Sequence, residues 1–407
     1  MFEFGRDLRK IFAQARHSED LGWVELIGAD MLRIEARREA TDAGRVSCAH
    51  PFETERRAAA LWRDHARRTG AADSLDRAER CADSLARQAD SVDQIAQAAV
   101  DQALTLLLRF DLCGDPDRLD RALGRLDLAT PPRKARLGAA VEAVRARINA
   151  RQARLSGKAE ALTEAAADLD AAARACGDDV DLRMEAAMLA LEAGVMLRDA
   201  ALLDRAGRDL GALVEAASPE HRPLTRARAL ALCGAGLSAL AAVAGHDEAR
   251  TQGRIMFDAA ADQFTPDHSP LDWAAIQMLR ADDDALPMMA LGEAERLTQG
   301  EGLIIGALVR ERCGSREVAL AEAVRDAASL QTLERRLLAR MVGADPLDWA
   351  ADQIVMGELA LARRRMEGVA APAGLGLILS EAAATARELG APALADRAER
   401  LLKTSRD

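Results

Sequence analysis

The sequence predicts an all-α protein assembled from repeated pairs of helices, and three observations lead to this prediction. Apolar residues recur at helical spacing along almost the whole chain, and no strict alternation is long enough for a half-buried strand. Ala and Leu, which are strong helix formers, supply most of the apolar surface, whereas the chain holds only four Trp, seven Phe and no Tyr. The string LDRA also occurs three times, beginning at Leu75, Leu119 and Leu203.

The length of the chain favours an array of repeats over a single core. The chain has 407 residues, of which 49% are hydrophobic and 30% charged, whereas one compact core rarely grows beyond about 300 residues. Glycines break the helical pattern regularly, and we expect them to end helices at Gly70, Gly114, Gly157, Gly177, Gly245, Gly300, Gly314 and Gly390. These breaks leave roughly 16–18 helices of about 12–22 residues, joined by short loops.

The LDRA strings mark the second helix of successive helix pairs. The first two begin 44 residues apart and the third follows after 84 residues, which is close to two further repeats. We expect Asp73, Asp115 and Asp199 to cap these helices, and Asp76 and Arg77 to face solvent. The Leu and Ala of each string share a buried face where a small Ala lets two helices cross, so the predicted structural anchors are Leu75, Ala78, Leu119, Ala122, Leu203 and Ala206. A weaker fourth copy lies in 388–402.

A second string, PLDWA, begins at Pro270 and again 76 residues later at Pro346. In both copies Ser269 or Asp345 can cap a helix, proline takes the first helical position, and Trp273 or Trp349 anchors the first turn. These strings resemble a divergent bacterial branch of the tetratricopeptide (TPR) repeat proteins, whose repeats begin with a similar PLDWA string and carry LDxA near the turn between helices. The resemblance covers about 55–404 in rhythm, fits 284–330 poorly, and implies an α-solenoid that binds other proteins; it implies no activity.

We therefore predict an α-solenoid, a right-handed superhelix of TPR-like helix hairpins with an N-terminal helical cap. Residues 1–50 form amphipathic or capping helices, 51–265 form hairpins, and 266–407 continue with degenerate hairpins and a C-terminal cap. Such an array leaves a concave groove that is lined by the first helix of each hairpin, and grooves of this kind bind peptides or helices of partner proteins.

The first sixteen residues form the candidate partner-binding helix. Phe4, Leu8, Ile11 and Phe12 share one helical face, Phe2 precedes them, and the basic residues lie largely off that face. Three roles stay open for this helix: a cap over the end of the solenoid, a segment that docks into a partner, or an anchor on a membrane surface. The apolar helix that continues through 21–27 favours the cap.

The sequence carries no recognisable catalytic, cofactor or metal motif. The six His show no HExxH pattern, the six Cys show no CxxC pair, and neither GxGxxG nor GxxxxGK[ST] occurs. The triplet 282–284 lacks the further carboxylate that a DDxxD metal site needs, which favours a solvated loop. Trp273 and Trp349 could stack on a ligand, but their matching repeat positions favour a role in the core. We therefore expect no enzyme activity, no cofactor and no metal.

Charge and apolar content bound the partners and the compartment. The net charge of −11 argues against nucleic-acid binding. Widely spaced Cys fit a reducing cytoplasm, and the uncharged run 229–245 is short for a membrane span, so we expect a buried helix there. Arg greatly outnumbers Lys, which is typical of a GC-rich bacterial genome. The leading hypothesis is a cytoplasmic, non-catalytic scaffold or adaptor; the alternative is a peripheral membrane or polar-localised protein that is anchored by residues 2–16.

Overall fold

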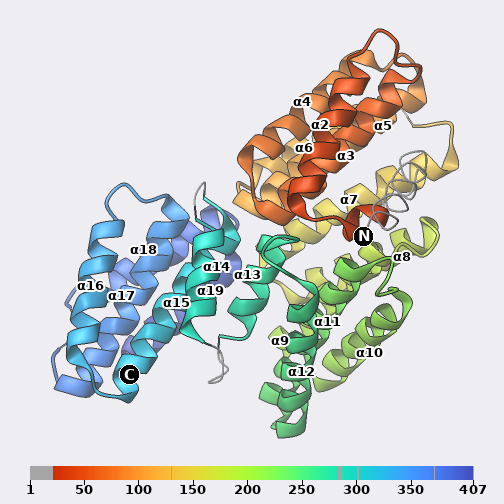
Figure 1. Ribbon diagram of the computed structural model, residues 1–407. Coiled ribbons are helices and arrows are strands. Elements are labelled where there is room, and N and C mark those ends of the chain that lie inside the picture. Colours follow the sequence, from red (N-terminus) through yellow and green to blue (C-terminus); the bar gives the residue numbers. More distant parts are fainter. Residues whose placement is uncertain (1–21, 130, 282–286, 300–301, 371, 407) are drawn as a thin grey trace, which may run out of the picture.

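The described part of the chain is entirely helical. A computed structural model describes residues 22–406 except 130, 282–286, 300–301 and 371. Over these residues it contains no strand, and it forms one short 3₁₀ helix and 18 α-helices: η1 Gly22–Leu26, α2 Ala29–Ala43, α3 Pro51–Thr69, α4 Ala72–Gln88, α5 Val92–Cys113, α6 Asp117–Asp127, α7 Ala135–Ser156, α8 Ala159–Ala175, α9 Val180–Leu197, α10 Ala200–Ala216, α11 Pro223–Ala244, α12 Asp247–Gln263, α13 Pro270–Leu279, α14 Met288–Leu297, α15 Ile304–Ala323, α16 Ala327–Arg340, α17 Pro346–Glu367, α18 Leu375–Glu388 and α19 Pro392–Arg406. The all-α prediction is confirmed (Figure 1).

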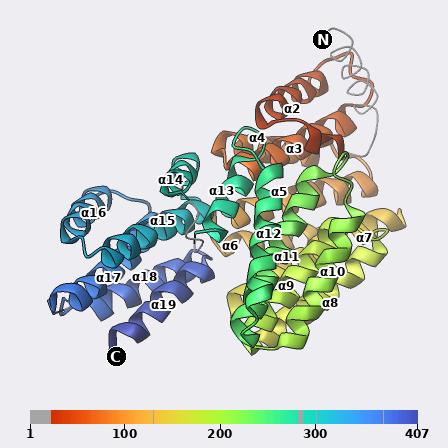
Figure 2. The same ribbon diagram turned by 60° about the horizontal axis from the view of Figure 1, so that its bottom comes forward.

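The helices pack in two sets that alternate along the chain. From α2 to α19 each helix packs against the next one, and from α3 onward each odd-numbered helix also packs against the next odd-numbered helix. In the described part of the chain the even-numbered helices make no comparable contacts with one another. The odd-numbered helices therefore form one continuous layer, and the even-numbered helices cover it from outside (Figure 2).

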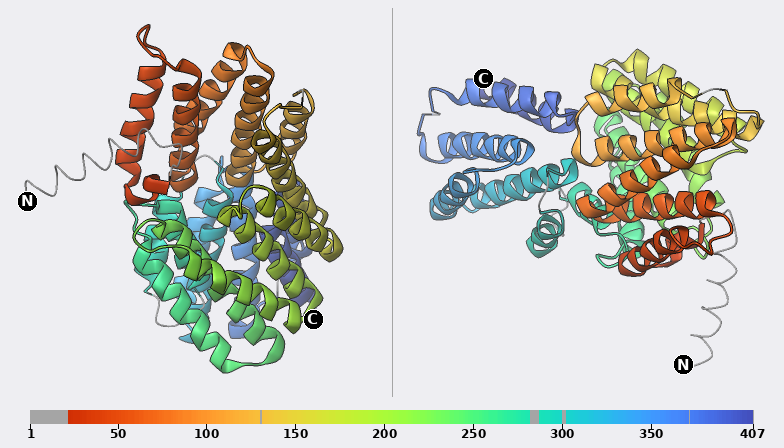
Figure 3. Two further views of the ribbon diagram at one scale, coloured as in Figure 1. Left: turned by 90° about the vertical axis from the view of Figure 1, so that its right-hand side faces the viewer. Right: turned by 90° about the horizontal axis from the view of Figure 1, so that it is seen from above.

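The described part of the chain also folds back on itself. η1 packs against α11, α3 against α13, and α5 against α15. Figure 1 shows the consequence: α2–α6 lie above, α7–α12 lie below and to the right, and α13 lies between these two groups. Seen from above, α15–α19 project to one side as a separate arm (Figure 3). The neighbourhood of α13 is thus the meeting point of three parts of the chain.

Most of the glycines expected at helix ends lie at helix ends, Gly314 does not, and Gly300 lies outside the described residues. Gly70, Gly157 and Gly245 follow α3, α7 and α11 in the left-handed conformation, which a residue without Cβ adopts at little cost. Gly314 instead lies inside α15, so its predicted role as a helix end is wrong. A Cβ atom on Gly314 would lie only 2.7 Å from a methyl carbon of Val355, which shows how closely α15 and α17 approach.

Some of the predicted N-terminal caps are found in the structure and others are not. The carboxylate of Asp199 accepts backbone hydrogen bonds at the start of α10, and that of Asp345 does so at the start of α17, as expected. The predictions for Asp73 and Asp115 are wrong. Asp73 lies in the first turn of α4, and Asp115 lies one residue before the Pro116 cap of α6 with a positive φ of 75°. Ser269 is the N-cap residue of α13, as expected, but its hydroxyl donates to the Asp272 carboxylate and makes no capping hydrogen bond with the backbone.

The repeat rhythm changes where the sequence fits it least. α13 and α14 have only 10 residues each, whereas α15 has 20. α11, which contains most of the uncharged run 229–245, is the one helix of the described part that is long and apolar enough to cross a membrane. It packs against α10 on one side and α12 on the other, as a core helix of the array does.

Candidate functional site

The odd-numbered helices surround a cavity of about 590 Å³, which we call the central groove. Its lining residues come from α3, α5, α7, α9, α11 and α13, together with Phe264, which directly follows α12. A larger cavity of about 790 Å³, bounded by the N-terminal parts of α3, α5 and α7, shares Ala60, Arg63 and Leu104 with it. The groove therefore continues along the inner layer past the cavity itself.

The wall of the central groove combines apolar side chains with charges of both signs. Leu104, Leu108, Met188 and Leu232 line it and are half-buried, and Leu279 is 38% exposed. The charged lining residues are five arginines and five carboxylates: Arg63, Arg67, Arg147, Arg151, Arg228, Asp64, Asp111, Asp181, Glu185 and Asp272. Unbranched Met side chains adapt to different partners, so this wall suits a chain with both apolar and charged groups.

Ion pairs connect neighbouring helices of the inner layer around the groove. Arg151 on α7 pairs with Asp111 on α5 at 2.8 Å and also with Glu185 on α9. Arg228 on α11 pairs with Asp272 on α13 at 2.6 Å. Because each pair joins one hairpin to the next, the charges fix the spacing of the groove wall as well as its polarity.

The C-terminal end of α3 places the most buried charge in this region. α3 begins with Pro51 in its first turn and ends at Gly70, and Arg67 and Arg68 lie in its last turn, where cations interact favourably with the helix dipole. Arg68 is 0% exposed. Its guanidinium donates to the carbonyl oxygens of Ile27 at 2.8 Å and Val24 at 2.9 Å, and it pairs with Asp64 at 2.7 Å.

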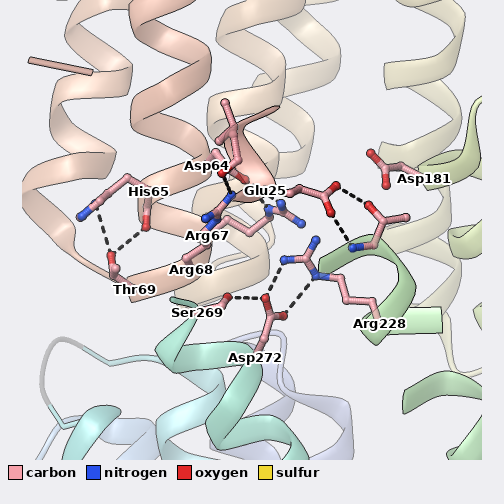
Figure 4. A network of polar contacts seen from close by, with 12 residues as sticks. Glu25, Asp64, His65, Arg67, Arg68, Thr69, Asp181, Arg228, Ser269 and Asp272 are labelled. Carbon is pink, nitrogen blue, oxygen red and sulfur yellow. Dashed lines mark hydrogen bonds and ion pairs between the residues drawn. The ribbon is translucent and has the colours of Figure 1, made fainter. Parts of the chain in front are cut away.

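We call the region where η1 meets α3, α11 and α13 the junction. Glu25 in η1 connects η1 to the start of α11, as Figure 4 shows. Its carboxylate accepts hydrogen bonds from the backbone N–H of Thr225 at 2.9 Å and from the Arg222 side chain at 2.8 Å. The Nε2 atom of His268 also lies 2.8 Å from the Glu25 carbonyl oxygen. η1 is thereby bound to the start of α11 and to the turn before α13, so the two edges of the array are held together beside the groove.

The carboxylates of this junction are held in their ionised form. Burial alone would raise the pKa of Asp64, but the neighbouring Arg67 and Arg68 outweigh burial and lower that pKa to about 2. The pKa of Asp272 is also lowered, because Arg228 more than offsets the effect of burial. Carboxylates with low pKa values that are paired with arginines serve as poor proton donors, and the arrangement fits binding better than acid–base chemistry.

Burial raises the pKa of a carboxyl group but lowers that of a histidine, and His65 shows the second effect. His65 belongs to α3, and its Nδ1 atom lies 2.8 Å from the hydroxyl of Ser74 on α4 and 3.4 Å from the Thr69 hydroxyl. Burial, with a smaller contribution from Arg33, lowers the pKa of His65 to about 4. The imidazole is therefore neutral at physiological pH. Among the described residues no group of three or more His, Cys, Asp or Glu could hold a metal ion.

Most of the sequence-predicted residues lie away from the central groove. Leu75, Ala78, Leu119, Ala122, Leu203 and Ala206 are each at most 1% exposed and belong to α4, α6 and α10, in the outer set. Trp273 packs against the cluster that contains the groove residues Phe264 and Ile276, and Trp349 packs against buried residues of α18 and α19. Phe2, Phe4, Leu8, Ile11 and Phe12 lie outside the described residues.

The polar residues of the LDRA strings are more engaged than the sequence suggested. The Asp76 carboxylate pairs with Arg109 of α5 at 2.5 Å. The guanidinium carbon of Arg77 lies 5.1 Å from the centroid of the Trp62 ring, so Arg77 is half-buried over an aromatic face instead of lying in solvent. The expectation of solvent-facing side chains is wrong for Arg77.

The groove residues themselves were missed in the sequence, although a signal for them exists. Several ion pairs join residues that are close to one repeat apart: 38 positions for Arg63 and Asp101, 40 for Arg151 and Asp111, and 44 for Arg228 and Asp272. The spacing of the LDRA strings, 44 residues, falls in the same range. A search for opposite charges at the repeat interval would have found the facing sides of the inner helices.

The six cysteines offer no reactive thiol in the groove. All are free, and Cys81, Cys233 and Cys313 are buried. Burial raises the pKa of Cys233 to about 11, and burial with neighbouring carboxylates raises the pKa of Cys81 and of Cys313 to about 12, so these thiols stay protonated.

No protein-family model matches the chain, and no curated protein sequence matches it either. The functional interpretation therefore depends on the geometry of the groove.

Proposed function

We propose that the protein is a non-catalytic scaffold or adaptor that binds a peptide or helix of a partner protein in the central groove. The observation that carries this proposal is the lining of the groove, which comes from six odd-numbered helices and combines half-buried Leu and Met with paired charges. Apolar anchors within a charged wall are what an amphipathic segment needs in order to bind along a helical groove.

The finer architecture in this proposal is a TPR-like α-solenoid, a right-handed superhelix of helix hairpins. Three features support it: the packing of each odd-numbered helix on the next, the ion pairs at intervals of 38–44 residues, and the buried LDRA alanines in the second helices. In such an array each hairpin covers the apolar side of its neighbour, and the inner helices face the ligand. Six free cysteines fit the cytoplasmic location that we propose with it.

Site-specific photo-crosslinking tests the groove directly. A photoreactive phenylalanine analogue replaces Met188 in the groove wall, or Leu377 on α18, which is 75% exposed and lies outside the groove. We expect the analogue at position 188, expressed in the native cells, to crosslink one discrete segment of another protein, which mass spectrometry then identifies. The analogue at position 377 should not crosslink that segment.

A charge-insertion variant provides the matched binding test. Met188→Glu places a carboxylate on the apolar part of the groove wall, whereas Leu377→Glu makes the same type of change on exposed surface. We expect only the groove variant to lose the crosslinked partner in co-purification, with unchanged helicity by circular dichroism. Equal recovery of the partner by both variants, or turnover of a substrate by the purified protein, would overturn the proposal.

A further inference from the structure

A second cavity of about 700 Å³ lies between α11–α13 on one side and α15 and α19 on the other, and we call it the arginine cleft. Its charged lining residues are six arginines and only two carboxylates: Arg250, Arg254, Arg280, Arg312, Arg397, Arg400, Asp258 and Glu311. The whole chain has a net charge of −11, so this concentration of positive charge is opposite in sign to the rest of the molecule. A cleft that is lined by one sign of charge raises the local concentration of oppositely charged ligands.

The two carboxylates of the arginine cleft already form ion pairs with arginines of the same cleft. Asp258 pairs with Arg280 at 2.8 Å, and Glu311 pairs with Arg397 at 2.8 Å. Arg254 on α12 and Arg400 on α19 are both exposed and have no ion-pair partner within the described part of the chain. The cleft therefore presents guanidinium groups from both of its walls whose charge the protein does not neutralise.

The shape of the charged surface indicates an extended ligand. An adjoining cavity of about 280 Å³ shares Arg312 and Arg397 with the arginine cleft, and Arg316 and Arg365 line it further on. Two carboxylates also line it: Glu322 pairs with Arg365 at 2.5 Å, and Glu358 pairs with Arg397. Arginines therefore follow one another from α12 across α19 to α15 and α17, which is longer than a single small anion requires. Leu279 and Leu308 add apolar wall on the same path.

The lining distinguishes an acidic peptide from a nucleic acid. Proteins that hold single-stranded nucleic acids combine positive charge with exposed aromatic rings on which bases stack. The only aromatic lining residue of the arginine cleft in the described structure is Phe257, which is 6% exposed and packed inside its hairpin. Carboxylates alternating with apolar side chains match what the cleft offers: guanidinium groups for the first and leucines for the second.

We propose that the arginine cleft binds an acidic, partly apolar segment of a partner protein in extended form, next to the central groove. α13 contributes to both cavities, because Ile276 lines the central groove, Arg280 lines the arginine cleft and Leu279 lines both. A partner that reaches both sites would be held by an amphipathic segment and an acidic segment that meet at α13. Such bivalent binding increases affinity without new contacts at either site.

Fluorescence anisotropy with a short labelled peptide of alternating Asp and Leu tests this proposal on the full chain. The double variant Arg254→Glu/Arg400→Glu should weaken peptide binding by at least about tenfold, because it reverses two unpaired charges. The control Arg121→Glu/Arg205→Glu reverses two exposed arginines on α6 and α10 and should leave the affinity within about twofold of the original protein. Both variants alter exposed side chains, and thermal unfolding checks that each keeps the fold.

Competition experiments decide between the other occupants. The Asn version of the peptide should bind at least about tenfold more weakly, and the affinity of the acidic peptide should fall with salt. Equal weakening in both double variants overturns the proposal, and so does better competition by single-stranded DNA or by inorganic phosphate.

Self-association that disappears in Arg254→Glu/Arg400→Glu would assign the cleft to a second copy of the chain. Tighter peptide binding after replacement of Asp282, Asp283 and Asp284 by Asn would assign it to the chain's own acidic residues.

Discussion

Thr225 at the start of α11 binds Glu25 of η1 across 200 positions of the chain. The Thr225 hydroxyl donates to one carboxylate oxygen of Glu25 at 2.5 Å, and its backbone N–H donates to the other at 2.9 Å. Both side chains are buried, at 1% and 7% exposure. A charge-assisted hydrogen bond between buried groups is strong, and losing the hydroxyl leaves the Glu25 carboxylate with one donor fewer, the Thr225 N–H and Arg222 remaining.

The first prediction concerns this closing contact. Thr225→Val keeps the shape of the side chain but removes the hydroxyl, so we expect the free energy of unfolding to fall by about 1–3 kcal/mol. Thr225→Ser, which keeps the donor, should cost less than about 1 kcal/mol. Urea unfolding measures both values. Hydrogen exchange of 22–27 should also become faster in Thr225→Val and not in Thr225→Ser. Equal stabilities for the two variants would show that the hydroxyl does not hold η1 in place.

The second prediction follows from the neutral His65. The pKa of His65 is about 4 in the folded protein, against an ordinary value of 6.5. Between these two values the unfolded chain takes up a proton that the folded protein does not, so the free energy of unfolding falls as the pH drops from 6.5 to 4. The full difference amounts to about 3 kcal/mol, since each unit of pKa is worth about 1.4 kcal/mol.

Urea titrations at pH 7.5, 6, 5 and 4 test this pH dependence. His65→Gln should lower the stability at pH 7.5, because the contact with Ser74 changes, but its stability should vary less with pH than that of the original protein. Thr69→Val changes a neighbour of the ring without removing the titrating group, so it should keep the full slope. His268, whose pKa burial also lowers, accounts for slope that remains in His65→Gln. The same slope in His65→Gln and in the original protein would contradict the neutral state of His65.

The helical class of the fold could be predicted from the sequence because its signals are local. Helical periodicity, Ala and Leu content, and glycines such as Gly70 depend on a few neighbouring residues, and they correctly predicted an all-α chain with the number of helices found in the described part. The misplaced caps show the limit of local signals: Asp115 has the side chain of a cap, but its carboxylate pairs with Arg118 instead.

The candidate site was less predictable because it depends on contacts between distant repeats. Arg68 and the neighbouring Arg67 have the same side chain, yet one is fully buried and the other has a side chain that is 41% exposed. The difference arises because the carbonyl oxygens of Val24 and Ile27, more than forty residues away, lie above one of them. The same holds for the central groove, which exists only once α13 has packed against α3.

The third prediction uses these two neighbouring arginines as a matched pair. Arg68→Lys replaces a planar group that serves two carbonyls and a carboxylate by a single ammonium, which cannot reach all three, so we expect a loss of about 2–4 kcal/mol. Arg67→Lys, at the partly exposed position, should cost less than about 1 kcal/mol. Urea unfolding compares them, and similar losses would mean that the buried guanidinium does not organise the junction.

The fourth prediction concerns the close approach of α15 and α17. Glycine inside a helix normally costs about 0.5–1 kcal/mol relative to alanine, so Gly207→Ala in α10, where nothing lies within 4 Å of the added Cβ, should stabilise the protein by that amount. Gly314→Ala should destabilise it by about 1–3 kcal/mol instead, because the Cβ would lie 2.7 and 2.8 Å from the two methyl carbons of Val355. Thermal unfolding gives the two signs. Val355→Ala should recover part of the loss in the Gly314→Ala background, since the two positions are in contact and their effects should not add. Stabilisation by both glycine substitutions would mean that the two helices can separate without cost.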